Sequence, residues 1–454
     1  MHTMNWPQLL TSDQLGRESK PRVYDSARSS FRRDGDRVTF SSAFRRLQDK
    51  TQVFPLADND YVRTRLTHSL EVASVARSLG ARVGADVCKR HQLQENGGDF
   101  GDIASAAALA HDLGNPPFGH SGEDAIRHWF INSTIAARAK ENLSEAQRVD
   151  IERYEGNAQG FRLVTRLQMP DNRGGLQLTC ATLGAFTKYP RASVVAGTDS
   201  YHGASAKKFG FYQGEAEHFA TVASRCGLIS RADGEAWWAR HPLAFLVEAA
   251  DDICYRLVDF EDGFRLGYLS YLETRDLMLE TMRPAHRPKR LDEIPNETRR
   301  IQLIRAMAIG SAIEECAEVF LSRETDILAG TFDTPLIDAV EHAPAWEEII
   351  RISRERIYNT PRGVEIEAAG FEVLGGLLDV FVSALNDVCS GAKPSPRSRK
   401  LLQLVPLENI GPNRVPDPDP YIRLMRMLDF VSGMTDRYAV TLYKKVRGIS
   451  LPGQ

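Results

Sequence analysis

His111 and Asp112 stand side by side at the end of an alanine-rich stretch, and both side chains can bind a metal ion. Residues 103–110 favour a helix, which Gly114 and Pro116 would end directly after the pair. The two polar groups therefore lie on the last turn of an apolar helix, where they need partners. A lone pair of this kind is more often a hydrogen-bonded core pair than a metal site, so other segments have to supply further ligands.

Two further groups of polar residues have spacings that suit a catalytic site. On the loop after the predicted helix, His120 and Glu123 are three residues apart and can lie side by side. Three polar residues recur every four positions along the apolar segment 241–262, namely Asp251, Tyr255 and Asp259. They share one face of a predicted helix, where acidic groups again need a partner such as a metal ion or a bound hydroxyl.

The apolar pattern over residues 66–83 predicts an amphipathic helix with Thr67 as its N-cap and His68 in its first turn. Arg65 adds positive charge at a helix N-terminus, which already favours anions. The sequence thus offers two imidazoles and two carboxylates, namely His68, His111, Asp112 and one of Asp251 and Asp252. Such a set suits a divalent ion such as Mn²⁺, Fe²⁺, Co²⁺ or Mg²⁺ and leaves room for water and a phosphate oxygen.

The composition describes a globular protein without an overall preference for nucleic acid. The chain has 454 residues, of which 42% are hydrophobic and 26% charged, with a net charge of −3. Its six cysteines are widely spaced and form no C-x-x-C motif, which is typical of a reducing compartment. There is no run of 18 consecutive apolar residues and no signal-peptide pattern at the N-terminus. We therefore expect a cytoplasmic protein that does not enter a membrane.

Several motifs resemble those of the bacterial dGTPase family, the deoxyguanosine triphosphate triphosphohydrolases of the HD superfamily. The matching segments are residues 40–54, 67–69, 111–123, 156–160, 188–190, 208–210, 248–255 and 433–438. The resemblance is good over residues 20–265 and moderate over 420–448, whereas 275–415 contains no recognised motif. One departure is Asn115, which stands where many members have a second histidine.

The resemblance implies roles for individual residues. It implies the metal ligands His68, His111, Asp112 and Asp251; we choose Asp251 over Asp252 because only Asp251 precedes Tyr255 and Asp259 by four and eight residues. In the family the matching tyrosine packs on the deoxyribose and the matching aspartate holds the 3′-hydroxyl, together with Gln48 here. Further substrate contacts carried over from the matching motifs are Arg65, Asn157, Lys188, Tyr189 and Lys208.

The implied reaction is metal-dependent hydrolysis of dGTP, or of several dNTPs, to a deoxynucleoside and inorganic triphosphate. His120 is the acid/base candidate and Glu123 favours its protonated form; His120 either protonates the leaving 5′ oxygen or orients water. One alternative is a broader HD nucleotide phosphohydrolase or phosphodiesterase. Another is a regulator that binds nucleotides or single-stranded DNA without turnover. Tyr255, Asp259, Gln48 and the lysines favour the triphosphohydrolase.

We expect an all-α protein with a multi-helix HD core, a helical C-terminal extension and at most a few short strands, for example at residues 37–40 and 205–211. The predicted division is an N-terminal arm with substrate contacts over 1–60, the phosphohydrolase core over 61–275 and a C-terminal helical region over 276–454. The family resemblance also implies a homo-oligomer, commonly a hexamer, and some members bind single-stranded DNA as an activator.

Overall fold

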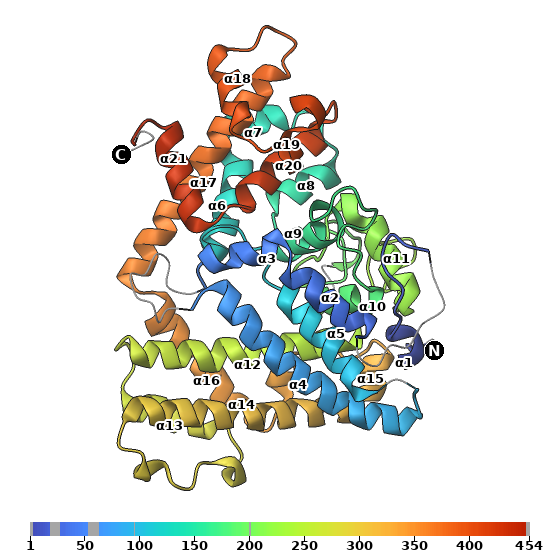
Figure 1. The fold of residues 1–454 in the computed structure, drawn as a ribbon, viewed down its shortest axis with the longest axis vertical. Coiled ribbons are helices and arrows are strands. Elements are labelled where there is room, and N and C mark those ends of the chain that lie inside the picture. Colours follow the sequence, from blue (N-terminus) through green and yellow to red (C-terminus); the bar gives the residue numbers. More distant parts are fainter. Residues whose placement is uncertain (1–2, 19–27, 53–62, 95, 199–200, 451–454) are drawn as a thin grey trace.

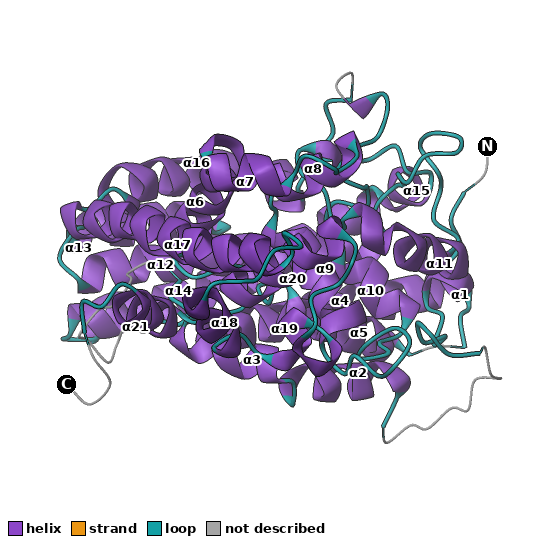
Figure 2. Cartoon of the chain, turned by 90° about the horizontal axis from the view of Figure 1, so that it is seen from above, coloured by secondary structure: helices purple, strands orange, loops and turns teal. Residues whose placement is uncertain are grey.

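The computed structural model describes residues 3–18, 28–52, 63–94, 96–198 and 201–450, which are mainly helical (Figure 2). No β-sheet forms among these residues, where extended segments pair only through isolated bridges such as that between Thr51 and Thr64. The prediction of an all-α fold is therefore confirmed.

Four long helices form the frame of the molecule: α4 (Arg65–His91), α12 (Pro242–Arg265), α14 (Glu297–Ser322) and α17 (Pro361–Val388). The shorter α-helices up to α12 are α1 (Trp6–Leu9), α2 (Ser30–Thr39), α3 (Ser42–Arg46), α5 (Gly97–Ala110), α6 (Gly119–Asn132), α7 (Thr134–Ala139), α8 (Glu145–Glu152), α9 (Gly156–Arg162), α10 (Cys180–Phe186) and α11 (Ala216–Cys226). Those that follow are α13 (Tyr271–Glu280), α15 (Glu324–Leu328), α16 (Ala343–Ile352), α18 (Pro396–Gln403), α19 (Leu407–Ile410), α20 (Pro420–Ser432) and α21 (Asp436–Val446). Two segments are π-helical, η2 (Leu163–Leu167) and η9 (Ser353–Tyr358), and the 3₁₀ turns include η1 (Leu47–Asp49) and η4 (Ala204–Ala206).

The larger of two hydrophobic clusters, called the lower cluster here, lies where α4, α5, α12 and α14 pack on one another (Figure 1). Helix α4 begins at a capping box, in which the side-chain oxygens of Thr64 and Thr67 each accept a hydrogen bond from the backbone N–H of the other residue. Glycine allows α5 to approach α4 closely, because a Cβ added at Gly80 would lie 2.6 Å from the carbonyl oxygen of Phe100. This close packing places the N-terminal turn of α4 and the C-terminal end of α5 in fixed relation.

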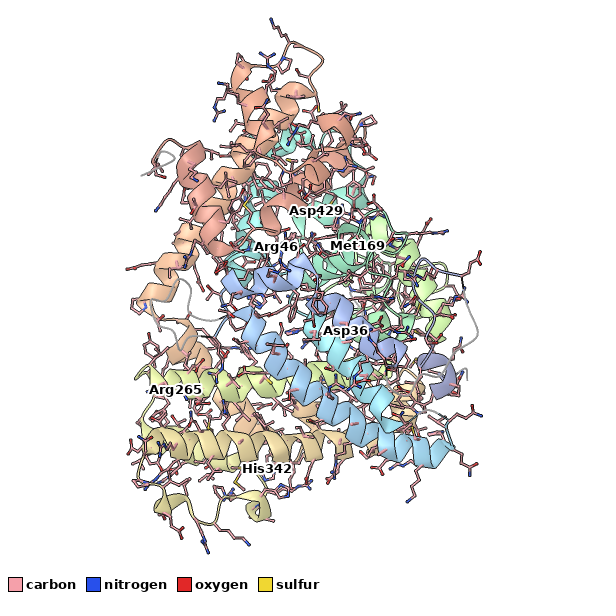
Figure 3. All side chains as sticks on the ribbon, in the orientation of Figure 1. Asp36, Arg46, Met169, Arg265, His342 and Asp429 are labelled. Atoms are coloured by element: carbon pink, nitrogen blue, oxygen red, sulfur yellow. The ribbon has the colours of Figure 1, made fainter. Side chains whose placement is uncertain are left out.

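The second cluster, called the upper cluster, lies where α17 packs against α6, α20 and α21 (Figure 1). A buried ion pair links it to the lower cluster, because Nε and Nη2 of Arg162 donate to Asp429 at 2.9 and 2.8 Å. In Figure 3, Asp429 lies in the upper half of the molecule, and Arg265 and His342 lie in the lower half. The two clusters thus form separate halves that meet around the middle of the structure.

Two local expectations about strands are wrong. Residues 37–40 are not a strand: α2 extends to residue 39, and its Phe31 and Val38, two turns apart, are both buried. Residues 205–211 form no hairpin but a 3₁₀ turn and a single bridge to residue 192. In both places the burial of side chains against neighbouring helices outweighs local strand propensity.

Helix α4 is longer than the sequence pattern predicts. Its N-cap is Thr64 rather than Thr67, and it continues to residue 91 instead of 83. Residues 84–101, which lie beyond the predicted helix, are helical for most of their length. The additional turns still place apolar side chains such as Val87 inside the lower cluster, and this burial stabilises them despite the polar sequence.

The division into residues 1–60, 61–275 and 276–454 stays a prediction. Its first boundary lies in the segment 53–62, outside the described residues. Apolar packing follows a different pattern, because α6 belongs to the upper cluster with the C-terminal helices, whereas α14 belongs to the lower cluster.

Among the described helices, one is long and apolar enough to cross a membrane, over Gly363–Val388 in α17. Of its most apolar window, 61% is buried inside the protein, against α6, α20 and α21. A buried core helix passes the same test of length and composition. The packing of α17 is that of a core helix in this structure.

Candidate active site

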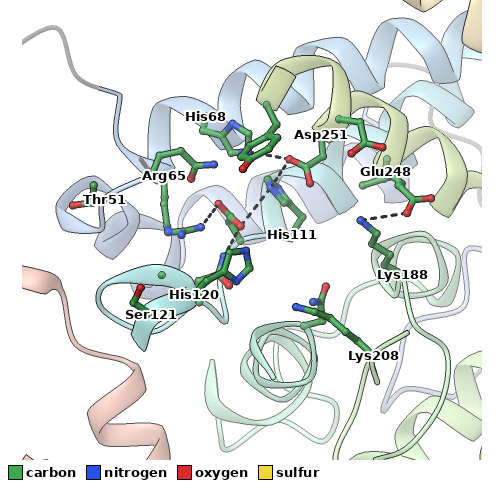
Figure 4. Close-up of a pocket in the computed structure, with 18 of the residues that line it drawn as sticks. Thr51, Arg65, His68, His111, His120, Ser121, Lys188, Lys208, Glu248 and Asp251 are labelled. Carbon is green, nitrogen blue, oxygen red and sulfur yellow. Dashed lines mark hydrogen bonds and ion pairs between the residues drawn. The ribbon is translucent and has the colours of Figure 1, made fainter. Parts of the chain in front are cut away.

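A cavity of about 500 Å³ lies where α4, the end of α5, α6 and α12 meet the first turns of α17 (Figure 4). Its volume is in the range of sites that bind small ligands. Eleven of the residues singled out from the sequence line it: His68, His111, Asp112, Asp251, Arg65, His120, Asn157, Lys188, Tyr189, Lys208 and Tyr255. Three others, Gln48, Glu123 and Asp259, are not part of its wall.

The four predicted metal ligands come from three helical segments. His68 lies in the first turn of α4, His111 caps α5 with Asp112 directly after it, and Asp251 lies within α12. The Nε2 atoms of His68 and His111 lie 3.1 and 3.6 Å from the same Oδ1 of Asp251. Ligand atoms of His68, His111 and Asp112 lie within 4.8 Å of one another. Both histidines therefore lie close to Asp112 on one side and to Asp251 on the other, and Figure 4 shows His68, His111 and Asp251 pointing toward one another.

The orientation of His111 fits a metal ligand. Its Nδ1 lies 2.7 Å from the carbonyl oxygen of Ala108, so Nδ1 carries the proton and donates it there. Its Nε2, with a free lone pair, points to the cluster and is buried without a hydrogen-bond partner among the described residues. A histidine fixed through one nitrogen with the other left open is the usual arrangement at metal sites.

Asp112 is held from both sides. Arg65 Nη1 donates to Asp112 Oδ2 at 2.8 Å, and Asn115 Nδ2 donates to Oδ1 at 2.5 Å. Burial works to raise the pKa of Asp112, but the charges of Arg65, His111 and His68 together outweigh burial and hold the pKa below its usual range. Asn115 thus orients a carboxylate in this chain.

The two neighbouring aspartates of α12 differ in environment. Burial would raise the pKa of Asp251, but His111 and the hydrogen bond with His68 outweigh burial and lower it. Burial raises the pKa of Asp252 to about 7, and within the described part of the chain the hydrogen bonds and ion pairs of the two histidines reach Asp251 and not Asp252. The ionised, histidine-bound carboxylate is the one of Asp251, which fits its choice as a ligand.

His120 and Glu123 form the pair expected of them. His120 Nδ1 lies 3.1 Å from Glu123 Oε2; the side chain of His120 is 83% exposed and that of Glu123 only 3%. The other oxygen of Glu123 accepts the backbone N–H of Gly156 at 2.8 Å. Burial would raise the pKa of Glu123, but its hydrogen bond with His120 and the charge of Lys208 hold it below the usual range. A fixed, charged glutamate thus supports an imidazole that faces the cavity.

Two lysines of the cavity are held by buried glutamates. Lys188 Nζ lies 3.3 Å from Glu248 Oε1, and Lys208 Nζ lies 3.1 Å from Glu155 Oε1. Glu248 is itself bound by the buried Arg240 at 2.6 Å. Burial would lower the pKa of Lys188, but Glu248 together with the neighbouring Tyr189 and Asp252 outweighs burial and raises the pKa. Both ammonium groups are therefore fixed in their charged form, which the sequence pattern did not reveal.

The remaining predicted contacts lie at different depths. Tyr255 lines the cavity, whereas Asp259 is buried behind the wall and Gln48 is exposed on η1. Gln52 lines the cavity instead, and its Oε1 is buried without a hydrogen-bond partner among the described residues. Tyr358, from the C-terminal half, also lines it. Sequence reasoning missed both; the only signal for Gln52 was its place in the motif that also contains Gln48.

A second, larger cavity of about 1120 Å³ lies between α2, η2 and the α19–α21 region. Its lining is mostly apolar and includes Phe40, Met169, Phe430 and Tyr438. No cluster of metal-binding side chains lies there, because the described residues form one such cluster, at the first cavity. The smaller cavity is therefore the candidate active site.

Comparison with known proteins agrees with this geometry. Residues 65–158, which contain three of the four predicted ligands, match the HD domain family. The chain is 46% identical to a deoxyguanosinetriphosphate triphosphohydrolase-like protein of Synechocystis over 99% of this chain and 100% of that protein. It is 40% identical to a like-named protein of Pseudomonas aeruginosa, over 99% and 100%. A deoxyguanosinetriphosphate triphosphohydrolase of Salmonella paratyphi A is 30% identical over 92% of this chain and 94% of its own length.

The helical fold and the His–Asp cluster define an HD-domain phosphohydrolase, a class of metal-dependent proteins. The extent and level of identity show the family within that class. The chain belongs to the deoxyguanosinetriphosphate triphosphohydrolase-like family, as the resemblance of its motifs implied.

Proposed function

We propose that this protein hydrolyses deoxynucleoside triphosphates, with dGTP as the expected substrate, to the deoxynucleoside and inorganic triphosphate. One observation carries the proposal: a metal-binding cluster, an exposed histidine on a buried glutamate and two fixed lysines share one cavity. The names of the relatives support the choice of nucleotide. The first two features can serve phosphoryl transfer in general, whereas the lysines suit a triphosphate.

His68, His111, Asp112 and Asp251 would hold a divalent ion, which we expect to be Mg²⁺ or Mn²⁺, with Co²⁺ and Fe²⁺ as alternatives. When bound, such an ion polarises a phosphate and lowers the pKa of coordinated water. The protein contributes fixed ligands: Asp112 is oriented by Arg65 and Asn115, and His111 by the backbone of α5.

The side chains around the metal-binding cluster would bind the triphosphate and transfer the proton. Arg65, Lys188 and Lys208 would bind the triphosphate, with Tyr189 and Asn157 beside the lysines. Water adds to the α-phosphorus, the bond from phosphorus to the 5′ oxygen breaks, and this oxygen takes a proton. His120 can donate that proton or orient the water, while Glu123 holds its ring in either role.

The wall of α12 would recognise the sugar. Tyr255 lies one turn beyond Asp251, so a deoxyribose between its ring and the metal-binding cluster would leave no room for a 2′-oxygen. Gln52, with its unpaired buried Oε1 at the cavity wall, is better placed than the exposed Gln48 to accept a hydrogen bond from a ligand hydroxyl. We therefore assign to Gln52 the sugar contact that the motif comparison gave to Gln48.

The purified protein should release inorganic triphosphate from dGTP in the presence of Mg²⁺ or Mn²⁺, resolved by ion exchange from the other nucleotides and products. His120→Ala should lose turnover, whereas the control His128→Ala, an exposed histidine on the same helix outside the cavity, should keep it. Release of monophosphate would favour a phosphomonoesterase or phosphodiesterase. Binding of nucleotide or single-stranded DNA with no product would favour a regulator.

We further propose that the protein works in the cytoplasm as a homo-oligomer, with a hexamer as the expected form. The buried position of α17 and the free cysteines of the described residues agree with a reducing, aqueous compartment. Light scattering of the purified protein tests the assembly, and adding single-stranded DNA to the dGTP assay tests activation.

A further inference from the structure

Arg240 is a buried cation directly before the N-cap of α12. Its side chain is 1% exposed, and it does not line the first cavity. A helix N-terminus disfavours a positive charge, and a buried charge is costly unless it is paired. Arg240 therefore needs strong partners, and the contacts of its guanidinium group lead to both lysines of the cavity.

The first set of contacts reaches Lys188. Arg240 Nε donates to the backbone carbonyl oxygen of Lys188 at 2.9 Å, and Nη1 donates to Glu248 Oε2 at 2.6 Å. The other oxygen of Glu248 pairs with Lys188 Nζ at the longer distance of 3.3 Å, and Figure 4 shows this pair. Because the guanidinium takes up much of the charge of Glu248, the ammonium group of Lys188 stays available to a phosphate. Arg240 thus holds the backbone of Lys188 and the counter-ion of its side chain.

The second set of contacts reaches the loop that carries Lys208. Arg240 Nε lies 3.8 Å from Oδ1 of Asp333, a buried carboxylate in the segment after α15. Asp333 accepts hydrogen bonds from the backbone N–H and the hydroxyl of Ser205, at 3.1 and 2.6 Å. Ser205 lies in η4, three residues before Lys208. The loop packs so closely on this carboxylate that a Cβ added at Gly203 would lie 2.1 Å from Asp333 Oδ2.

We propose that Arg240 is the positioning residue of the triphosphate site, because it holds Lys188 directly and the loop of Lys208 through Asp333. The inference rests on the proposed hydrolysis of deoxynucleoside triphosphates. The two lysines come from separate segments, and a triphosphate that contacts both binds more tightly when their spacing is fixed before it arrives. One buried guanidinium group between the two carboxylates sets this spacing.

The test compares the binding of two products, inorganic triphosphate and deoxyguanosine, of which the second carries no phosphate. Arg240→Lys keeps the buried charge and loses the planar group that reaches Glu248 and Asp333 together. Its dissociation constant for triphosphate, measured by titration calorimetry in Mg²⁺ buffer, should rise about tenfold, the usual value of a hydrogen bond assisted by a charge. The dissociation constant for deoxyguanosine should stay the same, whereas a purely structural role would weaken the binding of both products alike.

Asp333→Asn tests the second set of contacts without removing the buried cation. The change keeps the shape of the side chain and weakens its hold on Ser205, so the affinity for triphosphate should fall about threefold. Combined with Lys208→Ala, Asp333→Asn should cause no further loss, because Asp333 acts through Lys208. Additive losses in the double variant would overturn this part of the inference.

Arg162→Lys is the matched control, since Arg162 is a buried arginine that pairs with two buried carboxylates, Asp429 and Glu215, and does not line the first cavity. It should lower stability and leave the affinity for triphosphate unchanged. The inference is overturned if Arg240→Lys binds triphosphate as tightly as the parent. It is also overturned if Arg240→Lys loses affinity for both products alike, or if Arg162→Lys loses the same affinity for triphosphate.

The two proposals fail in different ways. Absence of triphosphate release from any nucleotide by the parent protein contradicts the proposed function. Normal release from dGTP, with the same triphosphate affinity in parent and Arg240→Lys, contradicts only the role of Arg240.

Discussion

The two halves of the cavity belong to different hydrophobic clusters, and their functional side chains differ in exposure to solvent. The metal ligands lie on α4, α5 and α12 of the lower cluster, where the side chains of His68 and His111 are 3% and 14% exposed. His120 lies at the start of α6 in the upper cluster, and its side chain is 83% exposed. Metal ligands gain from burial and rigid packing, whereas a group that passes protons to substrate or water needs access to both.

This contrast means that the relative position of the two halves matters as much as the residues of each. Two buried charges join them beside the cavity. Lys50 Nζ donates to the carbonyl oxygens of Asn115 and Ser432, the latter at 3.1 Å. Asp436 accepts the backbone N–H groups of Phe118 and Thr51, at 3.1 and 3.0 Å. We expect damage to the metal half, to the acid/base half and to these links to have separable consequences.

The largest effect is expected in the metal half. Asp251→Ala should lose both bound metal and activity, because Asp251 Oδ1 is the atom on which both imidazoles converge. Asp252→Ala should keep the metal, since the ion pairs of both histidines among the described residues are with Asp251 and Asp112 and not with Asp252. Metal content after gel filtration, measured by mass spectrometry, checks both. The assignment of α12 is wrong if Asp252→Ala loses the metal and Asp251→Ala keeps it.

The next effect concerns the acid/base half. His120→Ala and Glu123→Gln should each lower kcat by roughly 10²–10⁴-fold, the range of a positioned acid or base, with metal content unchanged. Steady-state kinetics with dGTP and the same metal assay measure the two quantities. Normal turnover in both variants, or loss of metal in either, would contradict the separation of the halves.

A smaller loss is expected when the link between the halves is cut. Asp436→Ala removes the acceptor for the N–H of Phe118, which lies two residues before His120 and has a φ of 64°. The loop that carries His120 should then lose its fixed position, lowering kcat roughly tenfold while the metal stays bound. Asp419→Ala, a helix cap in the same region outside the cavity, serves as control for stability. Equal loss of kcat in both variants would assign the effect to stability alone.

The smallest expected effect is a change in the pH dependence of stability, caused by a buried aspartate beside the upper cluster. Burial raises the pKa of Asp150 from 3.8 to about 7, despite hydrogen bonds from Ser193 and Tyr421. The folded state thus keeps a proton that the unfolded chain releases, so stability due to this group falls as pH rises from about 4 to 7. Asp150→Asn has no such titration. The free energy of unfolding, measured with urea at pH 5 and pH 8, should fall more in the parent than in Asp150→Asn as the pH rises. If the difference in free energy between the two proteins is the same at both pH values, the assignment to Asp150 is wrong.

Local sequence patterns were sufficient to predict the placement of residues whose positions depend on a single helix or a single turn. The ends of α5, the face of α12 that carries Asp251 and Tyr255, and the pairing of His120 with Glu123 follow from helical periodicity and from glycine and proline. The all-α fold and the family follow from the same patterns and motifs. These features depend on backbone geometry within a few residues, which the sequence encodes directly.

Other features were decided by tertiary packing alone. Gln52 rather than Gln48 reaches the cavity because a bridge between Thr51 and Thr64 holds the residues next to Gln52 against the N-terminus of α4. Glu248 and Glu155 fix the lysines, and Tyr358 covers Asp259, through contacts between segments that are distant in sequence. Such contacts depend on how two hydrophobic clusters pack around the cavity, and helical periodicity within one segment carries no information about them.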